Sequence, residues 1–488
     1  MAQPPAWRRL ASTTSTFTAK SAPSKAHLHK PILDDLFPRG YLLGGVHSGV
    51  KKDASMLDLA VLLSTSSRPT SAAASFTRNA FQAAPVTVSK AVLDQTAGRA
   101  RALVVNSGCA NAVTGRQGLS DAWAMARATD ALLAPSSSPN SPPSSSHASS
   151  SSETLVMSTG VIGQPLPISK ILTALRPHGP LAPHTLGHGF AAWEAAARAF
   201  MTTDTFPKLR ARTLPLGDGR TYRIAGIDKG AGMIHPDMVG VPRPSTTSTS
   251  TSAPHATLLG CIATDAPVAP ATLQSALNYA VQRSFNAISI DGDMSTNDTV
   301  VLFANGAGAG IDGGELSTRE IDESRDPGVF VRFRDGLTDF MQELAQLVVR
   351  DGEGATKFVT ISVEGARTYE DAHKIASRIS TSALVKTALY GEDANWGRVL
   401  AATGSVPLSA PLDPARVNVS FIPTDRSPIL PLLVNGEPEQ VDEVRAKEIL
   451  SAEDLEVRVD LGLGSESAKY WTCDFSYEYV KINGDYRT

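Results

Sequence analysis

The sequence predicts an α/β protein that contains a substantial amount of antiparallel sheet. Hydrophobic residues make up 42% of its 488 residues and charged residues 19%, a balance that allows a large folded core. Short apolar runs that end in turn residues alternate with longer segments of helical periodicity. Other segments alternate polar and apolar residues, which is typical of antiparallel strands. Because these elements do not follow a regular strand-helix-strand order, mixed sheets are expected.

Two patterns predict the strands. Continuous apolar runs that stop at turn residues indicate buried strands, and alternating residues indicate strands with one buried face. The apolar runs lie at 101–108, 154–160, 256–266 and 358–366. The alternating segments lie at 220–230 and, near the C-terminus, over 456–488.

Three segments have the periodicity of amphipathic helices. The clearest begins at Pro270 and extends to residue 288, and proline is favoured at the first position of a helix. The other two predicted helices cover 330–352 and 369–390. In the first helix the apolar side chains recur on one face, at Leu273, Ala276, Leu277, Ala280 and Val281.

Low-complexity segments interrupt this order. Residues 135–153 are rich in Ser and Pro, and residues 245–252 consist entirely of Ser and Thr. Such segments bury too little apolar surface to offset the entropy lost on ordering, so both are expected to be surface loops. A milder polar interruption at 317–328 is also a predicted loop. Because the composition is alike on either side of each segment, we interpret them as insertions within a fold rather than linkers between domains.

Composition excludes several classes of function. A net charge of −3 does not favour a protein that binds nucleic acid or a membrane surface. No apolar run reaches the roughly 18 residues of a membrane span. Cys109, Cys261 and Cys473 are far apart and lack metal-ligand spacing, which argues against a zinc site or a disulfide framework.

The N-terminal segment is typical of a mitochondrial presequence. It is rich in Ser and Thr, it has no acidic residue before Asp34, and it lacks the apolar core of a secretory signal. Its basic residues are Arg8, Arg9, Lys20, Lys25 and Lys30. We therefore predict a transit peptide over 1–27 and a location in the mitochondrial matrix. A disordered basic tail is the alternative interpretation.

Three short motif matches do not carry a function. Residues 308–313 match GxGxxG, but the helix that would bind a pyrophosphate is not predicted after them. Residues 351–357 lack the spacing of a P-loop. Residues 291–298 resemble the start of an EF-hand, but Thr296 and Leu302 occupy the positions of its glycine and its bidentate glutamate. An acidic turn is therefore expected there.

Glycine-rich turns follow several predicted strands, at 44–53, 106–115, 157–163 and 228–236. Glycine permits positive φ angles and lets backbone N–H groups face a ligand, so such turns can stabilise a developing oxyanion. Each turn alone is ordinary, but sites are often built from loops that a scaffold positions. Together they indicate a site without identifying its chemistry.

Ordered sequence blocks from about residue 40 to the C-terminus resemble one family. They include ALVVNSGCANAVTG, MSTGVIGQPLP, IDKGAGMIHPDM, SFNAISIDGDMSTNDT and ALYGEDANWGRVLAATG. Blocks of this kind in this order resemble the ornithine acetyltransferase (glutamate N-acetyltransferase, ArgJ) family, and the long N-terminus resembles its mitochondrial fungal branch. The resemblance implies a four-layer αββα sandwich with a smaller C-terminal α/β part. It also implies an assembly of two α and two β chains.

Self-cleavage between Ala256 and Thr257 is a further implication of the resemblance. The products would be an α chain over 28–256 and a β chain over 257–488 that begins with the nucleophile. A threonine hydroxyl is a weak nucleophile without an adjacent base. The new α-amine of Thr257, whose ordinary pKa is about 7.7–8.0, would supply that base.

The match to the family pattern is interrupted just before this bond. Asp237 stands where the family has Asn, and Val239 and Gly240 stand where it has Ala and Thr. The match resumes at Ala256. Residues 239–254 are therefore interpreted as an insertion ahead of the scissile bond.

The resemblance assigns roles to further residues. The oxyanion hole would consist of Thr159 and Gly160. One lysine and one glutamate would complement the carboxylate and the amine of an amino-acid substrate. Lys229 could instead be a solvated turn residue, and Asn483 could instead be a turn former; these are the alternative interpretations. The substrate contacts implied in this way are Thr202, Lys229, Thr257, Glu353, Asn483 and Thr488.

These assignments imply an acetyltransferase of arginine biosynthesis. It would move the acetyl group from N2-acetylornithine to glutamate in a ping-pong cycle through an acetyl-enzyme on Thr257. Acetyl-CoA would be a second donor, and no metal, prosthetic group, nucleic acid or membrane is expected as a partner. An N-terminal-nucleophile amidase or aminopeptidase of related architecture, which passes the acyl group to water, is the alternative. A chain that never cleaves is a third hypothesis.

Overall fold

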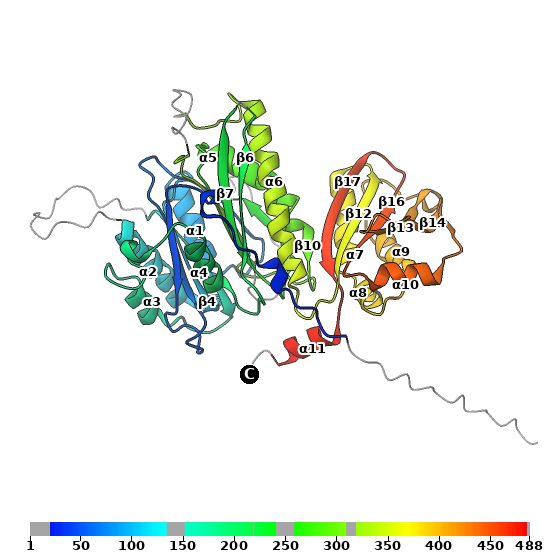
Figure 1. The fold of residues 1–488 in the computed structure, drawn as a ribbon, viewed down its shortest axis with the longest axis horizontal. Coiled ribbons are helices and arrows are strands. Elements are labelled where there is room, and N and C mark those ends of the chain that lie inside the picture. The colour runs from blue at the N-terminus through cyan, green and yellow to red at the C-terminus, as the bar shows by residue number, and fades with distance from the viewer. Residues whose placement is uncertain (1–19, 134–151, 218, 241–257, 309–318, 486–488) are drawn as a thin grey trace, which may run out of the picture.

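The computed structural model describes residues 20–133, 152–217, 219–240, 258–308 and 319–485. Two facing sheets with helices on their outer faces form a four-layer αββα sandwich, and a smaller α/β unit follows at the C-terminal end (Figure 1). This arrangement confirms the predicted fold class. None of the helices in the described ranges combines the length and the apolar character that crossing a bilayer requires.

A four-stranded sheet forms one inner layer. In spatial order its strands are β1 (Tyr41–Val46), β2 (Leu59–Ser64), β4 (Ala102–Cys109) and β5 (Thr154–Val161). Neighbouring strands are antiparallel except β4 and β5, which run parallel. The carboxyl ends of β4 and β5 therefore meet at one edge of the sheet.

A six-stranded sheet forms the other inner layer. In spatial order its strands are β6 (Lys208–Pro215), β7 (Thr221–Lys229), β9 (Leu259–Thr264), β11 (Thr299–Ala304), β3 (Ser71–Thr77) and β8 (Met238–Gly240). Only β9 and β11 are parallel neighbours among these strands. Both of them lie after residue 257, so the predicted α and β chains would share this sheet.

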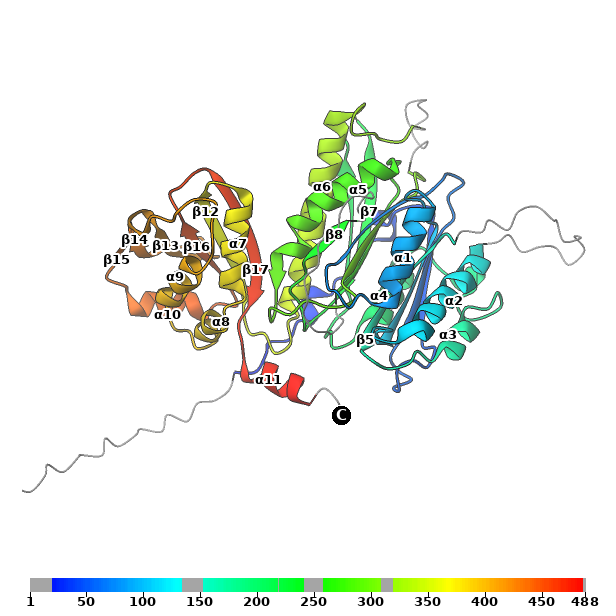
Figure 2. The ribbon, with the colours of Figure 1, turned by 180° about the vertical axis from the view of Figure 1, so that it is seen from behind.

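Helices cover the outer face of each sheet (Figures 1 and 2). Helices α1 (Ala84–Gln95) and α2 (Gly115–Leu133) pack on the four-stranded sheet, and α3 (Ile168–Ala174) packs on α2. Helices α5 (Pro270–Gln282) and α6 (Pro327–Arg350) pack on the six-stranded sheet. Helix α4 (Phe190–Phe200) contacts strands of both sheets.

Apolar side chains fill the space between the two sheets. Phe303 of β11 and Trp193 of α4 are completely buried in this core. Burial of one large apolar side chain stabilises a fold by about 1.5–3 kcal/mol. A second core lies on the other face of the six-stranded sheet and includes Phe340 and Leu344 of α6. The two cores fix the six-stranded sheet from both sides.

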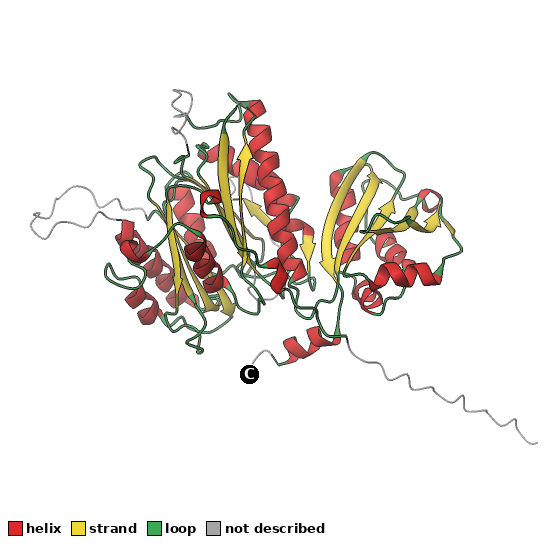
Figure 3. Ribbon diagram, viewed as in Figure 1, coloured by secondary structure: helices red, strands yellow, loops and turns green. Residues whose placement is uncertain are grey.

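The C-terminal unit contains a seven-stranded sheet with helices packed against it (Figure 3). In spatial order its strands are β10 (Ile288–Ser289), β17 (Glu466–Cys473), β12 (Phe358–Ala366), β16 (Asp454–Asp460), β13 (Asn418–Pro423), β14 (Leu430–Val434) and β15 (Glu437–Pro438). Strand β10 precedes the unit in sequence and pairs in parallel with β17. This pairing connects the sandwich to the C-terminal unit.

The helices of this part are α7 (Tyr369–Ser380), α8 (Ala383–Tyr390), α9 (Trp396–Gly404), α10 (Glu443–Ser451) and α11 (Tyr477–Gly484). The single helix predicted over 369–390 is wrong, because Ser382 caps the first turn of α8 and separates it from α7. The strands predicted as far as residue 488 are also wrong at the end. Ser476 accepts the Tyr479 N–H and begins α11 there.

The predicted loops lie partly outside the described residues. Of the insertion predicted over 239–254, Val239 and Gly240 form the end of β8, where Val239 pairs with Phe76 of β3. Of the Ser-rich insertion over 135–153, only the last two residues are described.

The N-terminal residues that the structure describes contact the C-terminal unit. Lys20 forms an ion pair of 2.5 Å with Glu392, and the buried Lys25 pairs with Glu453. Both lysines fall within the predicted transit peptide over 1–27. A cleavage after residue 27 would remove both ion pairs.

Strands β4 and β5 approach closely where they end. Their pairing becomes irregular at Gly108 and Cys109, opposite Thr159 and Gly160. Gly160 has a φ of 123°, and a Cβ atom there would lie 2.4 Å from the carbonyl carbon of Gly108. Only glycine fits this position, both because of its φ angle and because the neighbouring backbone fills the space.

We therefore expect Gly160→Ala to lower the free energy of unfolding by about 3 kcal/mol or more, since a backbone clash cannot relax like a side-chain contact. Gly163→Ala is the matched control. Gly163 lies in the same loop at a φ of 75°, and a Cβ atom there meets nothing within 4 Å. The control should lose only the roughly 1–2 kcal/mol of a left-handed non-glycine residue. Equal losses in urea unfolding would contradict the close approach.

Candidate active site

The predicted site residues that the structure describes come from five separate segments. These are the end of β5, the loop after α4, the end of β7, the turn after α6, and α11. The residues are Thr159, Gly160, Thr202, Lys229, Glu353 and Asn483. The remaining predicted residues, Ala256, Thr257 and Thr488, lie outside the described part of the chain.

The end of β5 meets the end of β7 at a direct hydrogen bond. The Lys229 Nζ atom donates to the Thr159 Oγ1 atom at 3.3 Å. Both side chains are buried, with exposed fractions of 1% and 0%. Burial lowers the pKa of Lys229, while the carboxylate of Asp204 opposes this effect. The alternative interpretation of Lys229 as a solvated turn residue is therefore wrong.

Thr202 connects to the same place through Asp204. The Asp204 carboxylate accepts the Thr202 N–H at 2.9 Å and the Gly230 N–H at 2.8 Å. It also accepts a hydrogen bond of 2.6 Å from the Lys208 Nζ atom. Asp204 thus fixes the loop that follows α4 against the residue after Lys229.

A buried ion cluster extends this connection to the turn after α6. The Lys208 Nζ atom lies 2.6 Å from Asp351 as well as 2.6 Å from Asp204. Burial would raise the pKa of Asp204, but Lys208 and Lys229 together hold it below its ordinary value. Asp351 also accepts the Thr205 N–H at 2.9 Å. Burial raises the pKa of Asp351, and Lys208 opposes this effect. The shared lysine holds the two carboxylates together, because moving either of them away from Lys208 would leave a buried carboxylate without its ion pair.

Glu353 follows this turn and contacts Asn483 of α11. The Asn483 Nδ2 atom donates to the Glu353 Oε2 atom at 2.8 Å, and the Glu353 N–H donates to the Ala231 carbonyl at 2.7 Å. The Glu353 side chain lies so close to Gly232 that a Cβ atom there would be 2.3 Å from Oε2. Asn483 lies within α11, so the alternative interpretation of Asn483 as a turn former is wrong.

The start of β9 lies beside Lys229. In the antiparallel pairing of β7 with β9, Lys229 is opposite Leu259. The Leu258 N–H donates to the Asp298 Oδ1 atom at 3.0 Å, and the Leu258 carbonyl accepts the Thr299 N–H at 3.1 Å. Burial raises the pKa of Asp298 to about 7, against the opposing effect of the N–H groups of Leu258 and Ser295.

The sequence prediction missed several residues of this site. Asp204 and Lys208 lie four residues apart in TTDTFPK, and Asp298 lies in STNDT. Each was inside a block that carries the family resemblance, but no spacing rule marks it. Asp351 was dismissed together with the P-loop match. No signal in the sequence distinguishes Asp204, Lys208 or Asp298, because TTDTFPK and STNDT are polar blocks in which a charged residue is ordinary.

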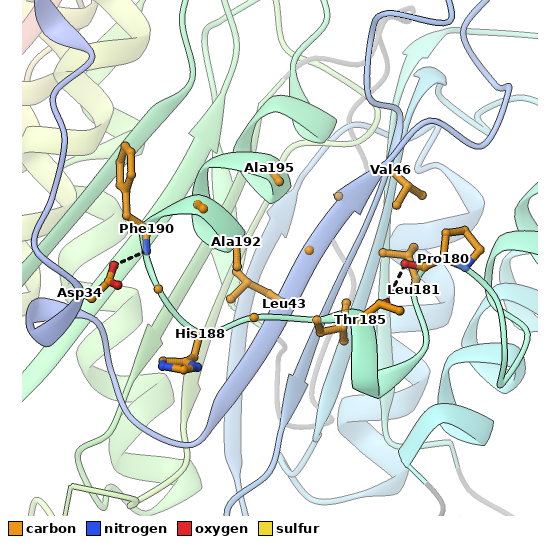
Figure 4. Close-up of a pocket in the computed structure, with 16 residues that line it drawn as sticks. Asp34, Leu43, Val46, Pro180, Leu181, Thr185, His188, Phe190, Ala192 and Ala195 are labelled. Carbon is orange, nitrogen blue, oxygen red and sulfur yellow. Dashed lines mark hydrogen bonds between the residues drawn. The ribbon is translucent and has the colours of Figure 1, made fainter.

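A pocket of about 540 Å³ lies elsewhere, between β1, α4 and residues 180–189 (Figure 4). Asp34 accepts the Phe190 N–H at 2.7 Å at its rim. None of the site residues described above lines this pocket. Within the described ranges, nowhere do three or more His, Cys, Asp or Glu side chains gather as metal ligands would.

Comparison with known proteins identifies the family. Residues 42–488 match the model of the ArgJ family. The mitochondrial arginine biosynthesis bifunctional protein ArgJ of Postia placenta is 66% identical, and the alignment covers 99% of each chain. The protein of the same name from Laccaria bicolor is 61% identical, over 97% of this chain and 98% of that one.

A solved structure is also similar. The arginine biosynthesis bifunctional protein ArgJ of Bacillus halodurans is 33% identical, covers 45% of this chain and 95% of its own, and has a TM-score of 0.40. The family match and the relatives that are similar over their full length confirm the resemblance and the mitochondrial location. The chain belongs to the ArgJ family and is a mitochondrial acyltransferase of arginine biosynthesis.

Proposed function

We propose that this chain cleaves itself between Ala256 and Thr257 and then transfers an acetyl group from N2-acetylornithine to glutamate. Thr257 carries the acetyl group between the two half-reactions. The observation that supports this proposal best is the position of Lys229 and Thr159 beside the start of β9, the strand that follows Thr257 in the chain. Lys229 bonds Thr159 on one side and is paired with Leu259 on the other.

In the first half-reaction the Thr257 hydroxyl attacks the acetyl carbonyl carbon of N2-acetylornithine. The hydroxyl proton moves to the α-amine of Thr257. Thr159 and Gly160 stabilise the resulting oxyanion. The C–N bond then breaks, ornithine leaves with the proton, and an acetyl ester remains on Thr257.

In the second half-reaction the amine of glutamate attacks this ester. The glutamate amine loses a proton to the α-amine of Thr257, and the C–O bond to Thr257 breaks. The same proton passes to the threonine oxygen, and N-acetylglutamate leaves. Lys229 binds the substrate carboxylate, and Glu353 with Asn483 binds the substrate amine, with Thr202 and Thr488 completing the site. The buried environment around Lys229 strengthens this charge pairing, because few water molecules compete with it.

Acetyl-CoA is the second acetyl donor in this proposal and acts as a co-substrate. The reaction needs no metal or prosthetic group, since the threonine itself carries the acetyl group. The cleaved chains remain associated because β7 of the α chain pairs with β9 of the β chain along the sheet. Two copies of each chain form the proposed heterotetramer.

Thr257→Ala should produce one uncleaved chain whose acetyl transfer falls by about 10⁴-fold or more, because both the nucleophile and its α-amine are lost. Thr257→Ser keeps a hydroxyl, so on a denaturing gel its full-length band should still be replaced by products of about half that length. Activity that survives in Thr257→Ala would refute the assignment of the nucleophile.

Ornithine release from N2-acetylornithine should depend on glutamate, because the acetyl-enzyme persists until an amine accepts its acetyl group. The measurement is ornithine formed over many turnovers, with and without glutamate. Release at the same rate in both cases would favour the amidase or aminopeptidase and refute the transferase.

Lys229→Met should lower kcat/KM by about 30-fold or more, because a buried charge partner of the substrate carboxylate is removed. Lys386→Met is the matched control. Lys386 is also completely buried, but it bonds Thr472 in the C-terminal unit at 2.9 Å. If both variants reduce kcat/KM equally at a temperature where both are folded, Lys229 does not bind the substrate.

A further inference from the structure

We infer that Asn297 and Asp298 are positioning residues that hold the oxyanion hole and the nucleophile in register. This inference rests on the proposed function, because it takes Thr257 as the nucleophile and Thr159 with Gly160 as the oxyanion hole. Neither Asn297 nor Asp298 was assigned a role from the sequence. They are adjacent in the chain, yet their side chains bind two different parts of the site.

Asn297 holds the strand ends that carry the oxyanion hole. Its Nδ2 atom donates to the Ser158 carbonyl at 2.7 Å and to the Ala110 carbonyl at 2.7 Å. The Thr296 hydroxyl donates to the Asn297 Oδ1 atom at 2.7 Å, so every polar atom of this buried amide group is bonded. Since a peptide unit is planar, fixing the Ser158 carbonyl also fixes the N–H of Thr159.

Asp298 holds the first residue after the nucleophile. Its Oδ1 atom accepts the Leu258 N–H at 3.0 Å, and its Oδ2 atom accepts the Ser295 N–H at 3.2 Å. The carboxylate is completely buried, and the charge of Lys229 acts to lower its pKa. The peptide unit that contains the Leu258 N–H also contains the Cα atom of Thr257, so the planarity of this unit transmits the restraint to the nucleophile.

The segment that carries this pair is itself fixed to the sheet. The Thr77 N–H donates to the Asp298 carbonyl at 2.8 Å, and the Thr77 hydroxyl donates to the Ser295 carbonyl at 2.7 Å. The Thr299 hydroxyl donates to the Asn297 carbonyl at 2.7 Å. One rigid turn before β11 therefore carries both contacts.

The distance between the nucleophile and the oxyanion hole must stay constant after self-cleavage. Self-cleavage removes the covalent connection that precedes Thr257, whereas the hydrogen bonds of Leu258 act on the residue that stays bonded to the nucleophile. A displacement of the nucleophile by about 1 Å from its carbonyl target can lower a rate about 100-fold. Asn297 binds the strand end that carries the oxyanion hole, and Asp298 binds the residue after the nucleophile. These two adjacent side chains thus fix the two groups relative to each other.

The test compares Asn297→Ala with Asn305→Ala. Asn305 is equally buried, and its Nδ2 atom also donates to two carbonyls, those of Arg39 and Gly40, each at 2.9 Å. We expect Asn297→Ala to lower kcat about 10- to 100-fold with KM changed less than about threefold. Asn305→Ala should lower the melting temperature to a similar extent and change kcat less than about threefold.

Asp298 is tested by Asp298→Ala and Asp298→Asn, with cleavage followed on denaturing gels and acetyl transfer by steady-state kinetics. Asparagine keeps an oxygen acceptor for the Leu258 N–H, so it should recover part of the cleavage rate and of kcat that alanine loses.

If an alanine variant does not fold, the comparison of Asn297 with Asn305 is repeated with Asn297→Asp and Asn305→Asp. Aspartate keeps the shape of the side chain and removes its N–H donors.

Three results distinguish a positioning role of Asn297 and Asp298 from a purely structural one. If Asn297 and Asn305 variants lose the same kcat, or if Asp298→Ala cleaves and turns over like the wild type, the positioning role is refuted while the proposed function stands. If Thr257→Ala, measured alongside, keeps its activity, both the proposed function and this inference are refuted. A selective loss of kcat in the Asn297 variants, with partial recovery in Asp298→Asn, supports the inference.

Discussion

The buried ion cluster centred on Lys208 is the interaction on which the arrangement of the site depends. Its ammonium group lies 2.6 Å from each of two carboxylates, Asp204 and Asp351, which belong to different segments of the chain. Asp204 in turn binds the backbone next to Thr202 and Lys229, and Asp351 lies two residues before Glu353. A charge in a protein interior is costly unless it is paired, so separating Asp204 or Asp351 from Lys208 would leave an unpaired ion. The cluster therefore holds together the loop after α4, the end of β7 and the turn after α6.

This constraint explains why residues distant in sequence lie close together in the fold. The sandwich brings the ends of β5 and β7 together, and the close approach at Gly160 leaves no room for a side chain between β4 and β5. Helix α11 contributes Asn483 from the far end of the chain. The site therefore uses both inner sheets, and the proposed α and β chains would both be needed to complete it.

Apolar runs and alternation were sufficient to predict a mixed α/β fold and strands such as β4, β5, β7, β9 and β12, because both patterns report burial directly. The four-layer architecture was implied by the family resemblance. The two patterns were not sufficient for α11, where a short stretch with Tyr and Val alternates like a strand although Ser476 caps a helix. The family resemblance supplied Lys229, Thr159 and Glu353. Asp204, Lys208 and Asp298 could not be predicted as site residues, because their role arises from partners that only the tertiary fold brings near.

The intact mass of the purified chains, measured after incubation with N2-acetylornithine in the absence of glutamate, tests the central claim most directly. Self-cleavage at Thr257 and an acetyl-enzyme on that residue predict a chain with the mass of residues 257–488 plus one acetyl group. Addition of glutamate should return this chain to its unmodified mass. An uncleaved chain that transfers acetyl groups, or a cleaved chain that never gains one, would contradict the claim.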